Sequence, residues 1–200
     1  MILPGHLSRM GFLLAGGKSS RMGANKALLE FRGGTLLERA LAVIGHVCPR
    51  VAMVGDPAQL SNYGSVVADV YSGCGPLAGI HAALVHSSAE LNLMLAVDMP
   101  FVSESLLSYL FSAAEESGAV VTVPQTRKGL QPLCAVYRRE FADAADLALR
   151  AGKYKIDATF AGVSIRIIEE GDLAKAGFSE RNFFNVNTPE DRRIADETVS

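Results

Sequence analysis

Short apolar runs alternate with segments of helical periodicity along most of the chain. Most of these runs are continuously apolar, which is typical of strands that are covered on both faces. Strands that alternate with helices form mostly parallel sheets, so the sequence predicts an α/β fold with a three-layer, doubly wound sheet. The runs that we interpret as strands are GFLLA (11–15), RVAMVG (50–55), SVVADV (65–70), LNLMLAV (91–97), AVVTVP (119–124), LCAVY (133–137) and VSIRII (163–168).

Helix signals lie between several of these runs. Helices are predicted over 35–48, 75–86 and 103–118, where apolar residues recur at helical spacing or turn signals bracket a helical segment. The residues expected at their ends are Thr35 with Glu38 as a capping box, Pro76 at a first helical position, Ser103 as N-cap and Gly118 after the last turn.

The composition is that of a single core-forming domain. With 200 residues, 49% hydrophobic residues, 20% charged residues and a formal net charge of -2, the chain is neither disordered nor a polybasic nucleic-acid binder. Its cysteines Cys48, Cys74 and Cys134 have no metal-binding spacing, and we find no signal peptide or membrane span. We expect a cytoplasmic domain over 1–200 without nucleic-acid or membrane partners, in which residues 1–9 are a loose lead-in.

The segment GFLLAGGKSSRMGANK (11–26) passes abruptly from an apolar strand into glycines, hydroxyls and cations. Gly16 and Gly17 lack a Cβ, so their backbone N–H groups can come close to an anion. Arg21 and Lys26 add positive charge. The spacing matches neither the P-loop nor GxGxxG. Its composition predicts a polyphosphate-binding loop, and the alternative is a flexible solvated turn.

Asp98 ends the apolar run LMLAVDMPF (93–101), in which Pro100 stops regular strand pairing. In a parallel sheet this position places a carboxylate at the edge where ligands bind. Such a carboxylate can hold Mg²⁺, which takes its remaining ligands from phosphate oxygens and water. The alternative is an Asx-type turn in which Asp98 bonds only to its own backbone.

Three other polar residues lie near the ends of predicted elements. Asp69, in the run 65–70, is a candidate acceptor for a ribose or base, or a solvated charge at a strand end. Asn185 and Asn187 precede a predicted helix start in which Asn187 or Thr188 is the N-cap. Their side chains offer both donor and acceptor groups, so the two can face one ligand, although turn formation is the alternative.

Several segments together resemble the molybdenum cofactor guanylyltransferases, within the nucleotide-diphospho-sugar transferase-like superfamily. They are LLAGGKSSRMGANKALL (13–29), GPLAGI (75–80), AVDMPF (96–101) and NVNTPED (185–191), with QPLCAVY (131–137) as a weaker match. The resemblance implies a Rossmann-like nucleotide-diphospho-sugar transferase fold. It also implies transfer of GMP from GTP to molybdopterin, with release of pyrophosphate and a requirement for Mg²⁺.

The same resemblance implies roles for individual residues. It implies that the nucleotide is contacted by Leu14, Ala15, Gly16 and Asp69. It assigns Asp98 as the Mg²⁺ ligand and Lys26 as the lysine that binds phosphate. It also places Asn185 and Asn187 near the pterin-side pocket. With Arg21, Lys26 is expected to offset charge on the departing pyrophosphate. Asn25 stands where the family usually has Asp, which puts any acid–cation pair within that loop in doubt.

The scaffold leaves other functions open. A cytidylyltransferase acting on the same pterin and a sugar-phosphate nucleotidyltransferase are the catalytic alternatives, and a nucleotide-binding regulatory subunit is the non-catalytic one. Gly16 stands where many cytidylyltransferases have alanine, and GPLAGI (75–80) also favours guanine. Proteins that deliver molybdopterin, or molybdoenzymes that receive the product, are the hypothetical protein partners.

Overall fold

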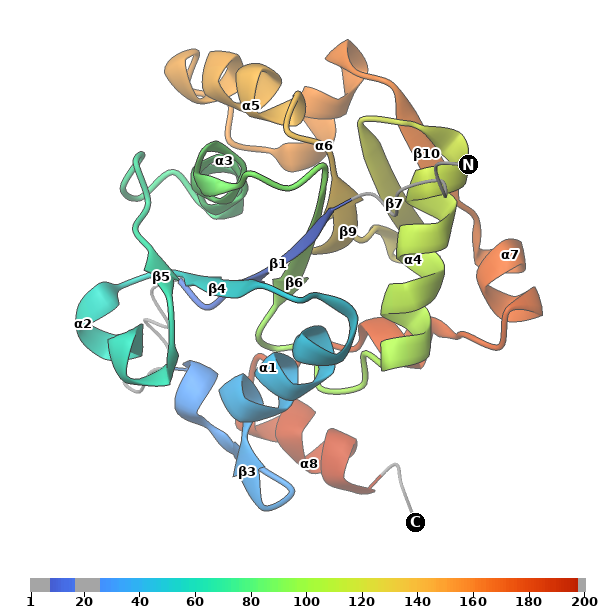
Figure 1. Cartoon of the computed structure of the whole chain (residues 1–200). Coiled ribbons are helices and arrows are strands. Elements are labelled where there is room, and N and C mark those ends of the chain that lie inside the picture. The colour runs from blue at the N-terminus through green and yellow to red at the C-terminus, as the bar shows by residue number, and fades with distance from the viewer. Residues whose placement is uncertain (1–7, 17–25, 198–200) are drawn as a thin grey trace, which may run out of the picture.

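The fold is built on a central eight-stranded sheet (Figure 1). The structure is a computed structural model, and it describes residues 8–16 and 26–197. The strand order is β10-β7-β9-β6-β1-β4-β5, and the short β8 pairs with β7. The strands are β1 (Arg9–Leu14), β4 (Val51–Val54), β5 (Val66–Val67), β6 (Leu91–Ala96), β7 (Val121–Thr126), β8 (Gly129–Leu130), β9 (Cys134–Tyr137) and β10 (Ile165–Ile168), with β2 (Glu30–Phe31) and β3 (Gly34–Thr35) in a separate hairpin.

Most neighbouring strands of the central sheet run parallel, as the sequence predicts. Strand β1 is parallel to both neighbours, with Phe12 opposite Ala52 of β4 and Met94 of β6. The exceptions are β9, which is antiparallel to β6 and to β7, and the short β8, which is antiparallel to β7. A parallel return needs a long crossover, usually a helix, and the segment between β7 and β9 contains only the short β8.

Helices cover both faces of the sheet, which confirms the three-layer, doubly wound arrangement (Figure 1). On one face lie α1 (Leu36–Val47) and α4 (Glu104–Ser117), and on the other lie α3 (Pro76–His86) and α5 (Phe141–Arg150). The shorter helices are α2 (Pro57–Leu60), α6 (Ile156–Thr159), α7 (Glu170–Lys175) and α8 (Pro189–Glu197). Within the described ranges, none of the helices has the length and apolar character that crossing a bilayer requires.

The apolar character of β1 follows from its central position. Phe12 packs into the core beneath α3 and α5, whereas Leu13 packs into the core beneath α1 and α4. Both side chains are fully buried. Successive residues of a strand point to opposite faces, so a strand covered on both sides shows a continuous apolar run rather than alternation.

The predicted cap residues set the ends of two helices. Thr35 Oγ1 accepts a hydrogen bond from Glu38 N at 3.1 Å, and Glu38 Oε2 accepts one from Thr35 N at 2.7 Å, which completes the capping box of α1. Ser103 Oγ accepts from Leu106 N at 3.2 Å at the start of α4. Gly118 follows α4 with a φ of 63°, a left-handed conformation that glycine adopts without strain.

The structure differs from the sequence prediction at several strand boundaries, and two of these differences change the element to which a discussed residue belongs. Strand β5 comprises only Val66–Val67, so Asp69 lies in the connection beyond the strand. Arg9 belongs to β1 rather than to the lead-in 1–9. Its guanidinium is 2.7 Å from Glu115 Oε1 and lies over the Phe111 ring, 4.6 Å from the ring centroid, which attaches the start of β1 to α4.

Candidate functional site

The carboxyl ends of β1 and β6 meet at the point where the winding of the sheet reverses. Strands β4 and β5 lie on one side of β1, and β6 lies on the other. Val97 N, just after β6, donates to Leu14 O at the end of β1 at 3.2 Å. Doubly wound sheets bind their ligands at this switch point. The chain therefore places the residues after Leu14 and after Val97 beside the crevice in which a ligand would bind.

The backbones that leave β1 and β4 approach each other closely. Ala15 N donates to Val54 O at 3.0 Å. A Cβ added to Gly55 would lie 2.8 Å from Leu60 Cδ1 and 3.2 Å from Gly16 N. Because there is no room for that atom, Gly55 fixes how near the turn after β1 can lie to β4.

Lys26 and Asp98 form an ion pair at the switch point. Lys26 begins a 3₁₀ turn, Lys26–Leu28, and its Nζ lies 2.5 Å from Asp98 Oδ2. The side chains of Lys26 and Asp98 are 20% and 16% exposed, so solvent screens their charges less than it would on an open surface. The two residues that the sequence singled out for phosphate and metal binding are therefore in direct contact.

The second carboxylate oxygen of Asp98 has no partner within residues 8–16 and 26–197. Asp98 Oδ1 is buried and accepts no hydrogen bond from the described residues, although buried polar atoms nearly always have a partner. Such an oxygen fits a cation ligand. The described residues hold no group of three His, Cys, Asp or Glu side chains around a common point. A metal at Asp98 would thus take most of its ligands from substrate and water, as Mg²⁺ commonly does.

The C-terminal segment returns to this ion pair. Val186 N donates to Asp98 O at 2.9 Å, which ties the segment to the end of β6. Lys26 Nζ also donates to Asn187 Oδ1 at 2.5 Å. The lysine is therefore held between a carboxylate and an amide that are far apart in the sequence but adjacent in the fold.

Asp191 holds the backbone around Asn187 in place. Asp191 Oδ2 accepts hydrogen bonds from Asn187 N at 2.9 Å and Thr188 N at 2.8 Å, and Thr188 Oγ1 accepts one from Asp191 N at 3.1 Å. Desolvation opposes ionisation of Asp191, but the Asn187 and Thr188 hydrogen bonds and the charge of Lys26 outweigh it and lower the pKa of the carboxyl group. Asp191 is thus an ionised cap at the start of α8.

A polar cavity of about 320 Å³ opens beside Asn187. Asn185 and Asn187 both line it, and Asn185 Nδ2 also donates to Phe183 O at 3.2 Å. The side chains that complete its wall are those of Thr126, Lys128, Gln131, Glu180, Phe183, Phe184 and Asp191. Amide groups and aromatic rings beside one another suit a flat heterocycle that carries hydrogen-bonding edges.

Asp69 lies away from the ion pair, on the β5 side of the crevice. Two strands, β4 and β1, separate β5 from β6 in the sheet. Asp69 Oδ1 lies next to Gly79 of α3, where an added Cβ would be 3.7 Å from it. Partial burial raises the pKa of Asp69. The structure thus brings Lys26, Asp98 and Asn187 together and leaves Asp69 at the opposite end of the edge, while Gly17 and Arg21 lie outside the described residues.

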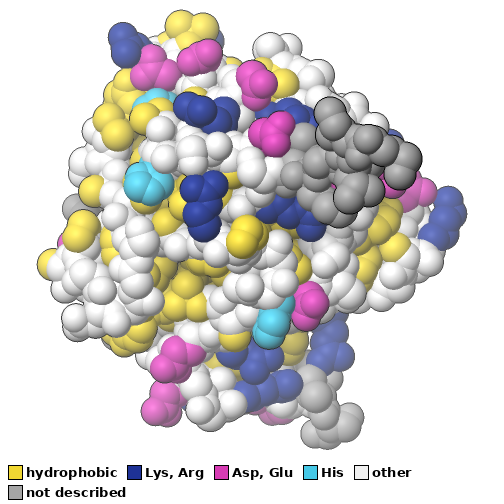
Figure 2. All heavy atoms as spheres, in the orientation of Figure 1, with side chains coloured by type: hydrophobic (Ala, Val, Ile, Leu, Met, Phe, Trp, Pro, Cys, Tyr) yellow, Lys and Arg dark blue, Asp and Glu magenta, His cyan; other side chains and the backbone are white. Residues whose placement is uncertain are grey.

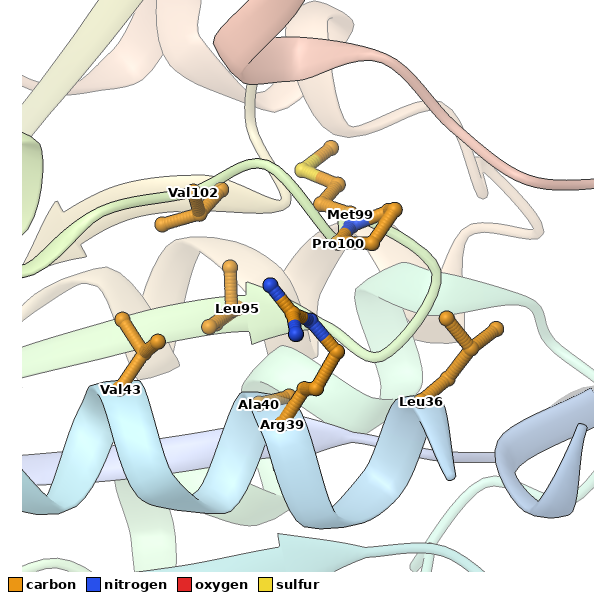
Figure 3. A pocket seen from close by; sticks show the side chains of 8 residues that line it. All are labelled: Leu36, Arg39, Ala40, Val43, Leu95, Met99, Pro100 and Val102. Atoms are coloured by element: carbon orange, nitrogen blue, oxygen red, sulfur yellow. The ribbon is translucent and has the colours of Figure 1, made fainter. Parts of the chain in front are cut away.

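A second cavity lies between α1 and the segment that follows Asp98 (Figure 3). Its volume is about 10 Å³, which is enough for a water molecule and far too little for a substrate. The Arg39 side chain projects from α1 across this gap, and its buried Nε has no hydrogen-bond partner in the described part of the chain. The Arg39 guanidinium lies 5.4 Å from the Phe31 ring centroid. We infer that the Arg39 guanidinium packs against the Phe31 ring and has no part in substrate binding.

Sequence analysis missed several residues of the larger cavity. Asp191 is not singled out in the sequence beyond its place in the motif 185–191, although its carboxylate fixes the backbone of Asn187. Thr126, Lys128 and Gln131 come from the β7–β8 hairpin, and only Gln131 fell in a segment with a family resemblance. A polar residue in a hairpin belongs to no periodic pattern. The sequence therefore does not predict that Thr126, Lys128 and Gln131 line one cavity together with Asn185 and Asn187.

Charge is dispersed over the face of the molecule shown in Figure 2. Basic and acidic side chains are interspersed on that face rather than gathered into one broad basic surface. This agrees with the formal net charge of -2. An anion would therefore be recognised locally, by groups such as Lys26, and not by a general field.

The fold and the site define a nucleotidyltransferase. A crystal structure of molybdopterin-guanine dinucleotide biosynthesis protein A from Archaeoglobus fulgidus is similar, with a TM-score of 0.83 and 30% sequence identity, over 94% of this chain and 97% of that one. The model of the MobA-like NTP transferase domain family matches residues 11–163. The chain belongs to this family.

Curated relatives extend the similarity over nearly the whole chain. A probable molybdenum cofactor guanylyltransferase from Pelotomaculum thermopropionicum is 38% identical over 187 residues, which are 92% of this chain and 90% of the relative. A protein of the same description from Clostridium perfringens is 32% identical over 186 residues, which are 91% and 93% of the two chains.

Proposed function

We propose that the protein transfers GMP from GTP to molybdopterin, with formation of the guanine dinucleotide cofactor and release of pyrophosphate. The observation that carries the proposal is the Lys26–Asp98 ion pair at the switch point, beside a polar cavity. The chain's membership of the MobA-like NTP transferase domain family and the names of its relatives support the choice of reaction.

The nucleotide is proposed to bind over the carboxyl ends of β1, β4 and β5. The backbone of Leu14, Ala15, Gly16 and Gly17 would contact it, and Asp69 would accept a hydrogen bond from its base or ribose. This assignment is supported by the close approach of Gly16 to Gly55, where neither residue has a side chain.

Lys26 is proposed to bind the β- and γ-phosphates, together with Arg21. Its ammonium would offset the charge that develops on the departing pyrophosphate. Asp98 is proposed to hold Mg²⁺, which is supported by its buried Oδ1, an atom without a hydrogen-bond partner among the described residues. When bound, the metal ion would supply Lewis-acid polarisation of the nucleotide phosphate oxygens.

The acceptor is proposed to occupy the cavity lined by Asn185 and Asn187. An anionic phosphate oxygen of molybdopterin then attacks the α-phosphorus of GTP in line, a new P–O bond forms, and the bond to the β-phosphate oxygen breaks. The electron pair of that bond leaves with pyrophosphate. An oxygen that is already anionic needs no general base, so alignment of the two substrates supplies much of the rate enhancement.

Turnover with purified components tests this proposal. The protein is incubated with GTP, molybdopterin and Mg²⁺, and pyrophosphate and the dinucleotide product are both quantified. Stoichiometric release of the two products is expected. CTP in place of GTP tests the cytidylyl alternative, and a sugar phosphate in place of molybdopterin tests the sugar-nucleotide alternative. Tight GTP binding without pyrophosphate release would instead identify a regulatory subunit.

A further inference from the structure

A polar cluster on α5 contacts the segment that carries Asp69. Tyr71 lies in the connection 68–75 between β5 and α3, and its hydroxyl donates to Asp146 Oδ1 at 2.5 Å. Asp146 Oδ2 is also 2.8 Å from Arg150 Nε. The Tyr71 ring meets the ring of His81 of α3 edge to face, with centroids 5.3 Å apart. One side chain of the connection is thus in contact with two helices.

The connection has few other attachments to the body of the protein. Val70 is exposed and retains 65% of its accessible surface. Gly73 and Gly75 have φ values of 78° and 74°, so the chain turns there without burying a side chain. Cys74 is half-buried against the core beneath α3 and α5, and its thiol forms a hydrogen bond with Tyr154 that raises the pKa of that phenol. A segment with so little buried surface depends on such polar contacts for a single conformation.

The hydrogen bond between Tyr71 and Asp146 has an ionised acceptor. The Tyr71 hydrogen bond, aided by Arg150 and His81, lowers the pKa of Asp146, so the acceptor is an ionised carboxylate at neutral pH. Hydrogen bonds to ionised acceptors are shorter and stronger than neutral ones. Arg150 lies on the same helix as Asp146 and holds the carboxylate from the other side.

We propose that Asp146 is a positioning residue for nucleotide binding, which through Tyr71 holds the connection 68–75 so that Asp69 faces the base or ribose. The inference rests on the proposed function, because it takes the β5 end of the crevice as part of the nucleotide site. Neither Asp146 nor Tyr71 needs to touch the nucleotide. Their effect is on the nucleoside end, whereas the polyphosphate end is bound near Lys26.

Titration calorimetry on the full chain separates the two ends of the nucleotide. Dissociation constants for GTP and for inorganic tripolyphosphate are measured for the wild type, Tyr71→Phe and Asp146→Ala. We expect both substitutions to raise the GTP constant about tenfold, the factor for one charge-assisted hydrogen bond, and to leave the tripolyphosphate constant unchanged. The kcat at saturating GTP should stay within about twofold of the wild-type value, so the loss appears in KM.

Two further variants serve as controls. Asp146→Asn keeps an amide oxygen that can accept from Tyr71, and it should recover most of the GTP affinity. Asp143→Ala removes an exposed carboxylate of the same helix, and it should bind GTP as the wild type does. The double variant Tyr71→Phe/Asp146→Ala should be no weaker than Asp146→Ala alone.

The outcomes distinguish this inference from the proposed function. Wild-type GTP affinity in Tyr71→Phe and Asp146→Ala would overturn the inference, as would an equal loss for GTP and tripolyphosphate. If the wild type binds CTP and not GTP, guanylyl transfer is rejected, and the same variants test the inference with CTP. If the wild type binds no nucleoside triphosphate, both are rejected.

Discussion

Lys26 and Asp98 lie 72 positions apart in the sequence, yet their side chains form an ion pair at the crevice between β1 and β6. Each belongs to a different sequence motif, and each has a different proposed role. Because both are mostly buried, removing one charge leaves the other poorly compensated. Substitution of either residue therefore tests the proposed role of the pair.

Asp98→Asn should nearly abolish transfer. The substitution keeps the size of the side chain but removes the charge proposed to hold Mg²⁺, and we expect kcat to fall at least about 100-fold, as when a major electrostatic group is lost. Initial rates at several Mg²⁺ concentrations measure the effect, with Asp143→Asn as the control. Wild-type activity at limiting Mg²⁺ would remove Asp98 from the metal site.

Lys26→Ala should weaken binding of GTP much more than binding of GMP. The ammonium is proposed to contact the β- and γ-phosphates, which GMP lacks, and a charged hydrogen bond corresponds to about tenfold to hundredfold in affinity. Calorimetry with both nucleotides measures the difference. If the two affinities fall equally, Lys26 does not bind those phosphates.

Local signals in the sequence were enough to predict most of the fold. The capping box of Thr35 and Glu38 and the termination at Gly118 each depend on residues within one turn, so neither needs tertiary information. The antiparallel direction of β9 was not specified, because strand patterns alone do not tell which way a strand runs. The connection that sets its direction is short and lacks a helix.

Less of the candidate site could be predicted from the sequence. Asp98 and Lys26 could be singled out because each follows an apolar run or a glycine turn, but their contact depends on the order of β1 and β6 in the sheet. The bond between Tyr71 and Asp146 spans 75 positions and has no local pattern at all. Such a pair depends on how the connection 68–75 lies against α5, which sequence periodicity does not fix.

The contribution of Asp191 to the stability of the fold should depend on pH. Its pKa in the folded chain lies below the ordinary value of 3.8, so its stabilising effect is present above pH 3.8 and is lost as the pH falls through the folded-state pKa. Asp191→Ala should lower the melting temperature at neutral pH through loss of its bonds to Asn187 and Thr188. Melting curves over a pH series should begin to converge with those of the wild type near pH 3.8 and should meet below the folded-state pKa. A constant difference down to pH 2 would contradict this.

Gly55→Ala should impair both folding and nucleotide binding. The new Cβ would lie 2.8 Å from Leu60 Cδ1 and 3.2 Å from Gly16 N, and forced packing of this kind costs about 1 to 3 kcal/mol. Gly45→Ala is the matched control, because nothing lies within 4 Å of a Cβ at this helical position. There alanine should stabilise the chain by about 0.4 to 1 kcal/mol. Denaturant titration and GTP binding measure both effects, and equal behaviour of the two variants would reject the close approach.

Nucleotide choice decides between guanylyl transfer and cytidylyl transfer. Guanine presents N1–H and an exocyclic amine, so its pocket needs acceptors, which Asp69 and backbone carbonyls near the β5 end could supply. Cytosine would leave some of these acceptors unpaired at about 1 to 3 kcal/mol each, which corresponds to roughly tenfold to hundredfold discrimination. We therefore expect kcat/KM with GTP to exceed that with CTP at least about tenfold. Inosine triphosphate, which keeps N1–H but lacks the amine, should fall between them. Equal or reversed use of GTP and CTP would reject guanylyl transfer, while the fold and the family membership of the chain would still identify a nucleotidyltransferase.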